Sequence, residues 1–283
     1  MLDKLKDWLL SLMTSSLKGF DEMLADSATV LKEGLGNWSE VAVLSDKLKP
    51  FCYTIITICL LIELAQVASK VDIIKWEHGL KICVKMVLAK VCIDISPTFL
   101  QACYAQAQDW ITKLSQGGST LGTKATDLLK PLLEEVSGLG NILGMFLSTF
   151  IVLLAIKICG LMVKVIAYGR MFELCVYLVV SPLPCSFFPL GNGDGGGVNR
   201  ITSKFFKNFI AVCLQGVMMI IVIRLFDTII GTALKDTLES MAANDDANVA
   251  VTNLIYTMLL GSIALVMGIV KSGSWAKSIM DAM

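Results

Sequence analysis

The chain has 283 residues, of which 55% are hydrophobic and only 17% are charged, and its 24 Lys and Arg residues balance 24 Asp and Glu residues. Soluble proteins average about 25% charged residues, because their surface must be covered, so this composition excludes an ordinary soluble enzyme. The zero net charge also excludes the overall basic excess of a nucleic-acid-binding protein, and any such contact must be local. A mean hydropathy of +0.71 is typical of a membrane protein.

Residues that could carry chemistry are few. The nine cysteines include no C-x-x-C pair, which argues against zinc and redox motifs. Most of them lie in apolar runs, where buried, reduced thiols are expected. The single histidine, His78, has no carboxylate cluster or nucleophile motif around it. The sequence therefore predicts no catalytic, cofactor-binding or metal site, and no enzyme.

The first predicted part, 1–49, is an N-terminal helix followed by a linker. Apolar residues recur at three- and four-residue steps over 2–24, with charged residues between them. This pattern predicts an amphipathic helix that lies in the membrane interface or packs on a partner subunit. Gly34, Gly36 and Pro50 then break the helical pattern, which predicts a linker into the membrane.

Residues 50–100 form the predicted first membrane helix pair. The apolar run 51–68 is at the lower edge of the ~17–25 residues that cross a bilayer, and it contains one charge, Glu63. The second segment, 79–100, leaves two alternatives open, a membrane span or an interfacial or bundle-buried helix. Its apolar sequence is interrupted by Lys81, Lys85, Lys90, Asp94 and Pro97.

A central polar loop is predicted at 101–141, with a short helix at 125–136. The core membrane domain then covers 142–283. Its two apolar runs, 142–167 and 172–190, are separated by Tyr168, Gly169 and Arg170 and are predicted to form a hairpin at 142–190. The second run ends in prolines, which a bilayer tolerates only where neighbouring protein satisfies the freed carbonyls.

The remaining elements are a Gly-rich loop at 191–197 and two spans at 208–234 and 251–270. Together these predictions give an all-α, polytopic transmembrane helix bundle with five or six spans and an N-terminal amphipathic helix. With six spans, one side of the membrane carries 14 Lys and Arg residues outside the spans and the other side four. The excess predicts cytoplasmic termini. If 79–100 does not cross, the N-terminus moves outside and the C-terminus stays cytoplasmic.

Four charges lie inside the predicted spans, where a central charge costs on the order of 2.5–3.5 kcal/mol. Each should therefore face protein or water, and together they form a candidate intramembrane polar path; structural ion pairs or snorkelling side chains are the alternative. The four are Glu63, Lys157, Arg224 and Asp227, of which the last two can pair on one helix face.

A basic helix face precedes the span at 208–234. Arg200, Lys204 and Lys207 recur at four- and three-residue steps, so they share one side of a helix. This face is a candidate contact for phosphates or for anionic lipid.

Ordered motifs in 142–283 resemble the polytopic membrane subunit of conjugative type IV secretion systems, the TrbL-type conjugal transfer family, in its Gram-positive branch. The first is Arg170 and Glu173 followed by an apolar span and a Ser-Pro break. A Gly-rich break, the basic helix, an Ala-x-x-Leu-Gln-Gly element and a closing Lys-x-Gly-x-x-Ala-Lys-Ser-Ile come next; the first half of the chain is similar only in layout. The family-motif residues are Arg170, Glu173, Ser181, Pro182, Pro184, Gln215, Gly216, Lys271, Gly273 and Lys277.

The resemblance implies a non-enzymatic channel or scaffold subunit of the plasma membrane that supports transfer of single-stranded DNA with its relaxase. It implies other secretion-channel membrane subunits and the transfer ATPases as partners, a homo-oligomer in the lipid bilayer, transient contact with single-stranded DNA and no soluble small-molecule substrate. The better-studied branch has an outside N-terminus, in conflict with the six-span charge count. The alternative is a multi-pass small-molecule transporter or permease subunit, which would require broken helices in corresponding halves; only the break near Pro182 is visible.

Overall fold

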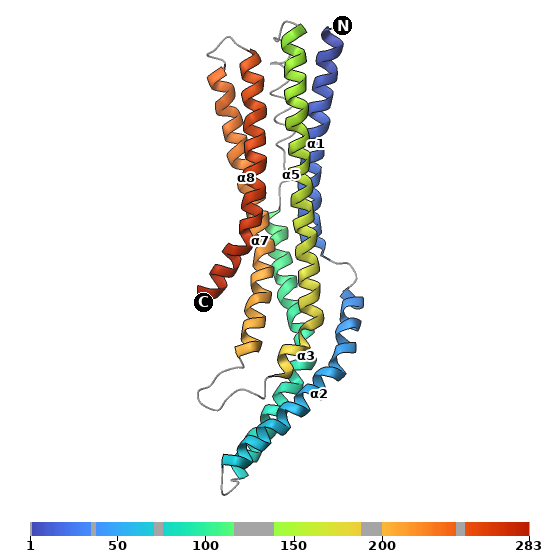
Figure 1. Cartoon of the computed structure of the whole chain (residues 1–283), viewed down its shortest axis with the longest axis vertical. Helices are drawn as coiled ribbons and strands as arrows, with labels where there is room; N and C mark the ends of the chain where they lie inside the picture. The colour runs from blue at the N-terminus through green and yellow to red at the C-terminus, as the bar shows by residue number, and fades with distance from the viewer. Residues whose placement is uncertain are drawn as a thin grey trace. The chain divides into compact units, whose positions relative to one another are not determined.

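The computed structural model describes residues 2–34, 38–70, 76–115, 139–187, 200–241 and 247–282, and within these ranges it contains helices and no strand. This confirms the all-α prediction. The predicted short helix at 125–136 and the Gly-rich loop at 191–197 lie outside the described residues. The helices, labelled in Figure 1 where space allows, are α1 (Leu2–Glu33), α2 (Trp38–Lys70), α3 (Trp76–Leu114), α5 (Leu139–Val180), α6 (Pro182–Ser186), α7 (Arg200–Met241) and α8 (Ala247–Ala282).

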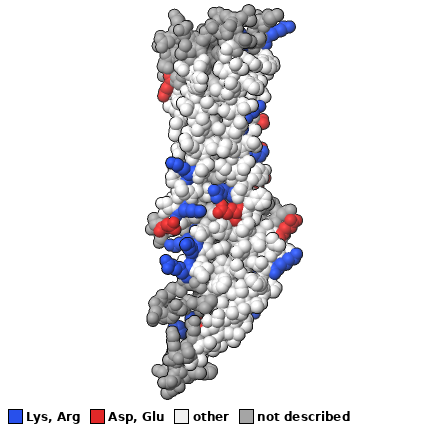
Figure 2. Space-filling view, viewed as in Figure 1, with Lys and Arg blue, Asp and Glu red and all other residues white. Residues whose placement is uncertain are grey.

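Four helical segments of the described chain are long and apolar enough to cross a membrane: Trp38–Ala65, Phe146–Ser186, Arg200–Ala233 and Thr252–Asp281. The transmembrane helix bundle is thus confirmed, with four candidate spans among the described residues where five or six were expected. The predicted segment 79–100 is not among the four, since its lysines and Asp94 lower the hydropathy of α3. Uncharged residues cover most of the described surface visible in Figure 2.

The predicted hairpin at 142–190 is wrong. The helix α5 runs without interruption from Leu139 to Val180, through Tyr168, Gly169 and Arg170. These three residues include no proline, and one glycine weakens a helix by about 1 kcal/mol without ending it. At 1.5 Å per residue, the 42 residues of α5 extend about 63 Å, roughly twice the hydrocarbon thickness of a bilayer.

The predicted linker before Pro50 and the first part of the predicted central loop are also helical. The helix α2 begins at Trp38 and contains Pro50, and α3 continues to Leu114. An ion pair between Asp46 and Lys49, 2.7 Å apart, supports the first turns of α2. The break in the helical pattern falls earlier, at Gly34, whose φ of +65° suits glycine at a helix C-terminus.

The chain forms two compact units, each assembled from three separate segments. Unit 1 contains Met1–Glu33, Trp110–Gly169 and Gln215–Trp275; unit 2 contains Gly34–Asp109, Arg170–Leu214 and Ala276–Met283. These units do not follow the four successive parts that the sequence suggested, because the long helices α3, α5, α7 and α8 contribute residues to both.

In unit 1, the amphipathic helix α1 packs along α5 of its own chain. The rings of Trp8 and Phe146 are 4.9 Å apart, and Lys164 Nζ lies 2.7 Å from Asp26 Oδ2. In each pair the two residues are 138 positions apart in the sequence. The helices α1 and α5 therefore run parallel, as Figure 1 shows, and keep the same register along their length. The apolar face of α1 is therefore buried within the chain, whereas the sequence suggested the membrane interface or a partner subunit. This buried face includes Leu9, Met13, Leu17, Phe20, Leu24 and Leu31.

In unit 2, α2, α3 and the short helix α6 enclose a small apolar core. Its fully buried members are Cys52, Ile56, Ala89, Ile93 and Cys185. Four partly buried side chains, Tyr53, Cys92, Leu183 and Phe206, pack against it. All nine cysteines are free. Cys52, Cys59, Cys185 and Cys213 are buried, as expected for thiols that act as small hydrophobic residues, whereas the other five are partly or fully exposed.

Candidate functional site

Glu63, the first predicted intramembrane charge, forms an ion pair across unit 2 with Lys85. Glu63 lies near the C-terminal end of the candidate span in α2, and Lys85 lies on α3. Their side chains are only 15% and 23% exposed, and Glu63 Oε2 has no hydrogen-bond partner among the described residues. The sequence singled out Lys85 only as an interruption of an apolar helix. The structure shows that this lysine neutralises the carboxylate, which lowers the cost of placing either charge near the membrane.

A second polar contact joins the same two helices about three turns away. Tyr53 on α2 donates a hydrogen bond of 2.5 Å to Asp94 Oδ1 on α3. The sequence does not predict this pair, because nothing in a single sequence relates positions 41 residues apart. The two contacts fix α2 against α3 at both ends of the segment between them.

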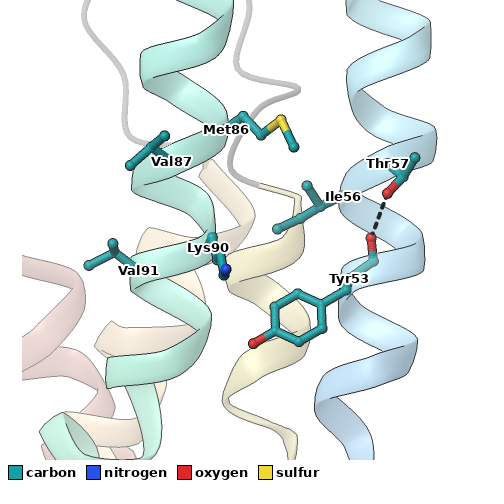
Figure 3. Close-up of a pocket in the computed structure, with 7 residues that line it drawn as sticks. All are labelled: Tyr53, Ile56, Thr57, Met86, Val87, Lys90 and Val91. Carbon is teal, nitrogen blue, oxygen red and sulfur yellow. Dashed lines mark hydrogen bonds between the residues drawn. The ribbon is translucent and has the colours of Figure 1, made fainter.

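A cavity of about 570 Å³ opens between the two helices, in the segment between these polar contacts (Figure 3). Its walls are apolar apart from the tips of Tyr53, Thr57 and Lys90, and the Thr57 hydroxyl is already bonded to the Tyr53 carbonyl at 3.0 Å. Lys90 is the one cation among the lining residues. The full lining is Tyr53, Ile56, Thr57, Met86, Val87, Lys90 and Val91.

The proline break between α5 and α6 lies in the core of unit 2. Ser181, Pro182 and Pro184 are buried. The Thr202 hydroxyl on α7 donates a 2.7 Å hydrogen bond to the Pro184 carbonyl, and the Ser181 hydroxyl donates one of 2.9 Å to the Leu178 carbonyl. Hydroxyl groups thus donate hydrogen bonds to carbonyls at the break, as the sequence predicts for prolines in an apolar run.

The other three residues of the predicted polar path belong to unit 1. Lys157 is exposed on α5. Arg224 on α7 donates hydrogen bonds to two carbonyls at the C-terminal end of α3, those of Leu114 at 3.1 Å and of Ser115. A cation at this position satisfies orphan carbonyls and complements the helix dipole, so the guanidinium has a structural role. Asp227 lies one turn further along α7 and also has a polar or electrostatic partner.

The predicted basic face is present at the start of α7. Arg200, Lys204 and Lys207 are all exposed on its first two turns, in unit 2. Three cations near a helix N-terminus oppose the helix dipole. They would be stabilised by an anion bound between them.

The predicted family-motif residues do not gather at one site. Arg170 and Glu173 form an ion pair within α5. Gln215 and Gly216 are buried on α7, Gln215 lies against Gly273 on α8, and Lys271 and Lys277 are exposed. No group of three or more His, Cys, Asp or Glu side chains suited to a metal ion occurs in the part of the chain that the structure describes.

Comparison with known families gives a match over the first part of the chain. A family model described as TrbL/VirB6 plasmid conjugal transfer like protein matches residues 35–182, just over half of the chain. The match includes the segment from Arg170 to Pro182 but stops before 183–283, which contains most of the motifs that carry the predicted resemblance. It includes α2 and α3, for which the sequence predicts similarity only in layout. Neither curated proteins nor solved structures gave a match.

Proposed function

Since the chain belongs to the TrbL/VirB6 plasmid conjugal transfer family, we propose that it is an integral membrane channel or scaffold subunit of a conjugative type IV secretion system. In this role it supports passage of single-stranded DNA and its relaxase across the cell membrane. The observation that carries the proposal is the family match over 35–182, a range that includes the candidate span Trp38–Ala65 and most of the candidate span Phe146–Ser186. The chain works without catalysis of its own, as a homo-oligomer beside other channel subunits and the transfer ATPases.

The proposed orientation rests on the six spans that the sequence predicts. Counted over those spans, the Lys and Arg residues outside them favour a cytoplasmic C-terminus by the positive-inside rule. In the proposed assembly, Arg200, Lys204 and Lys207 bind phosphate groups of anionic lipid or, transiently, of the transferred strand, because three exposed lysine and arginine side chains on one helix face suit either phosphate source.

Conjugation frequency tests the proposal directly. Donors that lack this gene would be complemented with wild type, with Arg200→Gln/Lys204→Gln/Lys207→Gln, or with Lys235→Gln as a control at an exposed cation elsewhere on α7. We expect deletion to abolish transfer, wild type and the control to restore it, and the triple variant to restore it only partly at equal membrane abundance. Unchanged transfer on deletion would overturn the proposal and favour a small-molecule transporter.

A further inference from the structure

The helix α1 has a mostly polar exposed face. Eight polar residues recur along it at three- and four-residue steps and are exposed, and two exposed apolar residues, Trp8 and Ala25, lie on the same side. We name this face the polar stripe: Lys4, Asp7, Ser11, Ser15, Lys18, Glu22, Asp26 and Thr29. On the opposite side of α1, the apolar residues that pack into unit 1 are buried.

Contacts inside unit 1 show which residues of α5, α7 and α8 lie at the same height as the middle of the polar stripe. The ring of Phe20 on α1 lies 6.2 Å from that of Phe226 on α7, and a Cβ at Gly160 on α5 would lie 3.0 Å from Phe20. A Cβ at Gly261 on α8 would lie 3.2 Å from Phe226. One residue from each of the four helices therefore meets at a single level.

That level is inside three candidate spans. Gly160, Phe226 and Gly261 lie within Phe146–Ser186, Arg200–Ala233 and Thr252–Asp281, each at least seven residues from the nearer end. Lys18 and Glu22 flank Phe20 by two residues on either side, or about 3 Å along the helix. The middle of the polar stripe therefore lies level with three helical segments that are long and apolar enough to cross a membrane.

Lys157 extends this polar surface onto α5. It precedes Gly160 by three residues and Lys164 by seven, so all three share the α5 face that packs against α1. Lys157 is exposed, and no partner for it occurs among the described residues. A lysine at this depth requires water or an anionic partner.

Much of the remaining surface of unit 1 is apolar. The helices α5, α7 and α8 expose large hydrophobic side chains, among them Ile158 at 51%, Ile229 at 62% and Leu260 at 67%. These residues suit lipid contact, whereas the charges of the polar stripe do not. One compact unit thus has two surfaces of opposite polarity.

We infer that the polar stripe of α1, together with Lys157, lines a water-filled path through the membrane. The stripe contains both cations and anions, so the path admits water and hydrated polar chains and does not select for one sign of charge. The inference deepens the proposed transfer function and rests on it for the identity of the cargo. The presence of water at the stripe can be measured without any transfer assay.

Cysteine accessibility tests this inference in membranes. Single cysteines would be introduced at Ser15 and Glu22 in the polar stripe, and at Ile158 and Leu260 on the apolar surface as matched controls. Native Cys83, the exposed cysteine, would be replaced by serine. The labelling of this serine variant, which still contains the other eight cysteines, is the background to be subtracted. The probe is a charged, membrane-impermeant methanethiosulfonate applied to intact cells and to inverted vesicles.

We expect Ser15→Cys and Glu22→Cys to react at least about 10-fold faster than Ile158→Cys and Leu260→Cys, because the reactive thiolate forms in water and not in hydrocarbon. Slow labelling at all four positions would overturn the inference, since lipid or protein would then cover the stripe. Equally fast labelling at all four would also overturn it, since unit 1 would then lie outside the bilayer. If Glu22→Cys does not accumulate, Ser11→Cys replaces it. None of these readouts depends on conjugation, so they separate a failure of this inference from a failure of the transfer function.

Discussion

Gly273 on α8 lies directly against the side-chain amide of Gln215 on α7: a Cβ at position 273 would be 2.7 Å from Gln215 Nε2. Gln215 is buried, and its Nε2 has no hydrogen-bond partner among the described residues. Two further glycines of α8, Gly261 and Gly268, face Ile230 and Val222 of α7 in the same way. Small residues allow membrane helices to approach closely, which gives Gly261, Gly268 and Gly273 a packing role; Gln215 and Gly273 are two of the residues on which the predicted resemblance rests.

Gly261→Leu should destabilise unit 1. The position has no room for a side chain, because even a Cβ would clash with Ile230, and overpacking of this kind costs about 1–3 kcal/mol. The thermal midpoint of the detergent-solubilised protein measures the loss. Gly144→Leu is the control, since a Cβ at this exposed glycine meets nothing within 4 Å. Equal midpoints for the two variants would show that α7 and α8 are not in close contact.

Reversing the ion pair between Glu63 and Lys85 should preserve most of the stability that either single change removes. Glu63→Gln leaves the lysine without its partner, and Lys85→Gln leaves the carboxylate, at a cost of about 1–3 kcal/mol, less than the ~3–5 kcal/mol for fully buried pairs. The double variant Glu63→Lys/Lys85→Glu restores opposite charges in contact.

Thermal midpoints and membrane abundance of the four proteins would be compared with those of Lys81→Gln, which removes an exposed lysine one turn away on α3. We expect the control to match wild type. A reversed pair that is no better than the worse single variant would contradict the ion pair.

The sequence predicted the helical class and the amphipathic nature of α1 because both follow from local composition and periodicity. It failed where a local signal was weak. The sequence predicts a break at Gly169, yet this single glycine does not end α5. It also predicts a linker before Pro50, yet this proline lies inside α2. It also failed for partners distant in sequence. Nothing in the spacing of Glu63, Lys85, Arg224 or Ser115 indicates that the first two would pair across two helices or that Arg224 would bind the end of α3.

Arg224→Gln should loosen the C-terminal end of α3. The guanidinium donates to the carbonyls of both Leu114 and Ser115, and charge-assisted hydrogen bonds contribute about 1.5–3 kcal/mol. Arg224→Lys should recover part of this energy, because an ammonium keeps the charge but lacks the planar fork that reaches two acceptors. Hydrogen exchange over 108–115 reports the effect locally. Exchange that stays at the wild-type rate in both variants would argue against this contact.

Tyr104 should make the stability of the protein fall at alkaline pH. This residue lies on α3 outside the four candidate spans, with its ring 5.0 Å from that of Trp38 and its hydroxyl 3.4 Å from Met171 Sδ. Burial raises the pKa of the phenol from 10.0 to about 12. The folded state therefore holds its proton more tightly than the unfolded state. This contribution to stability is fully present below pH 10.0 and is lost as the pH rises towards about 12.

The comparison of wild type with Tyr104→Phe isolates this contribution from the other groups that titrate in the same range. The phenylalanine variant fills the same space and cannot ionise, so the difference in unfolding midpoint should be constant from pH 7 to 9 and then move in favour of the variant as the pH rises above 10.0. Detergent-solubilised protein and intrinsic tryptophan fluorescence suffice for the measurement, because Trp38 reports directly on the packing around Tyr104. A difference that stays constant to the highest pH at which the wild type is folded would mean that the phenol is not buried, and that α2 and α3 do not meet at this contact.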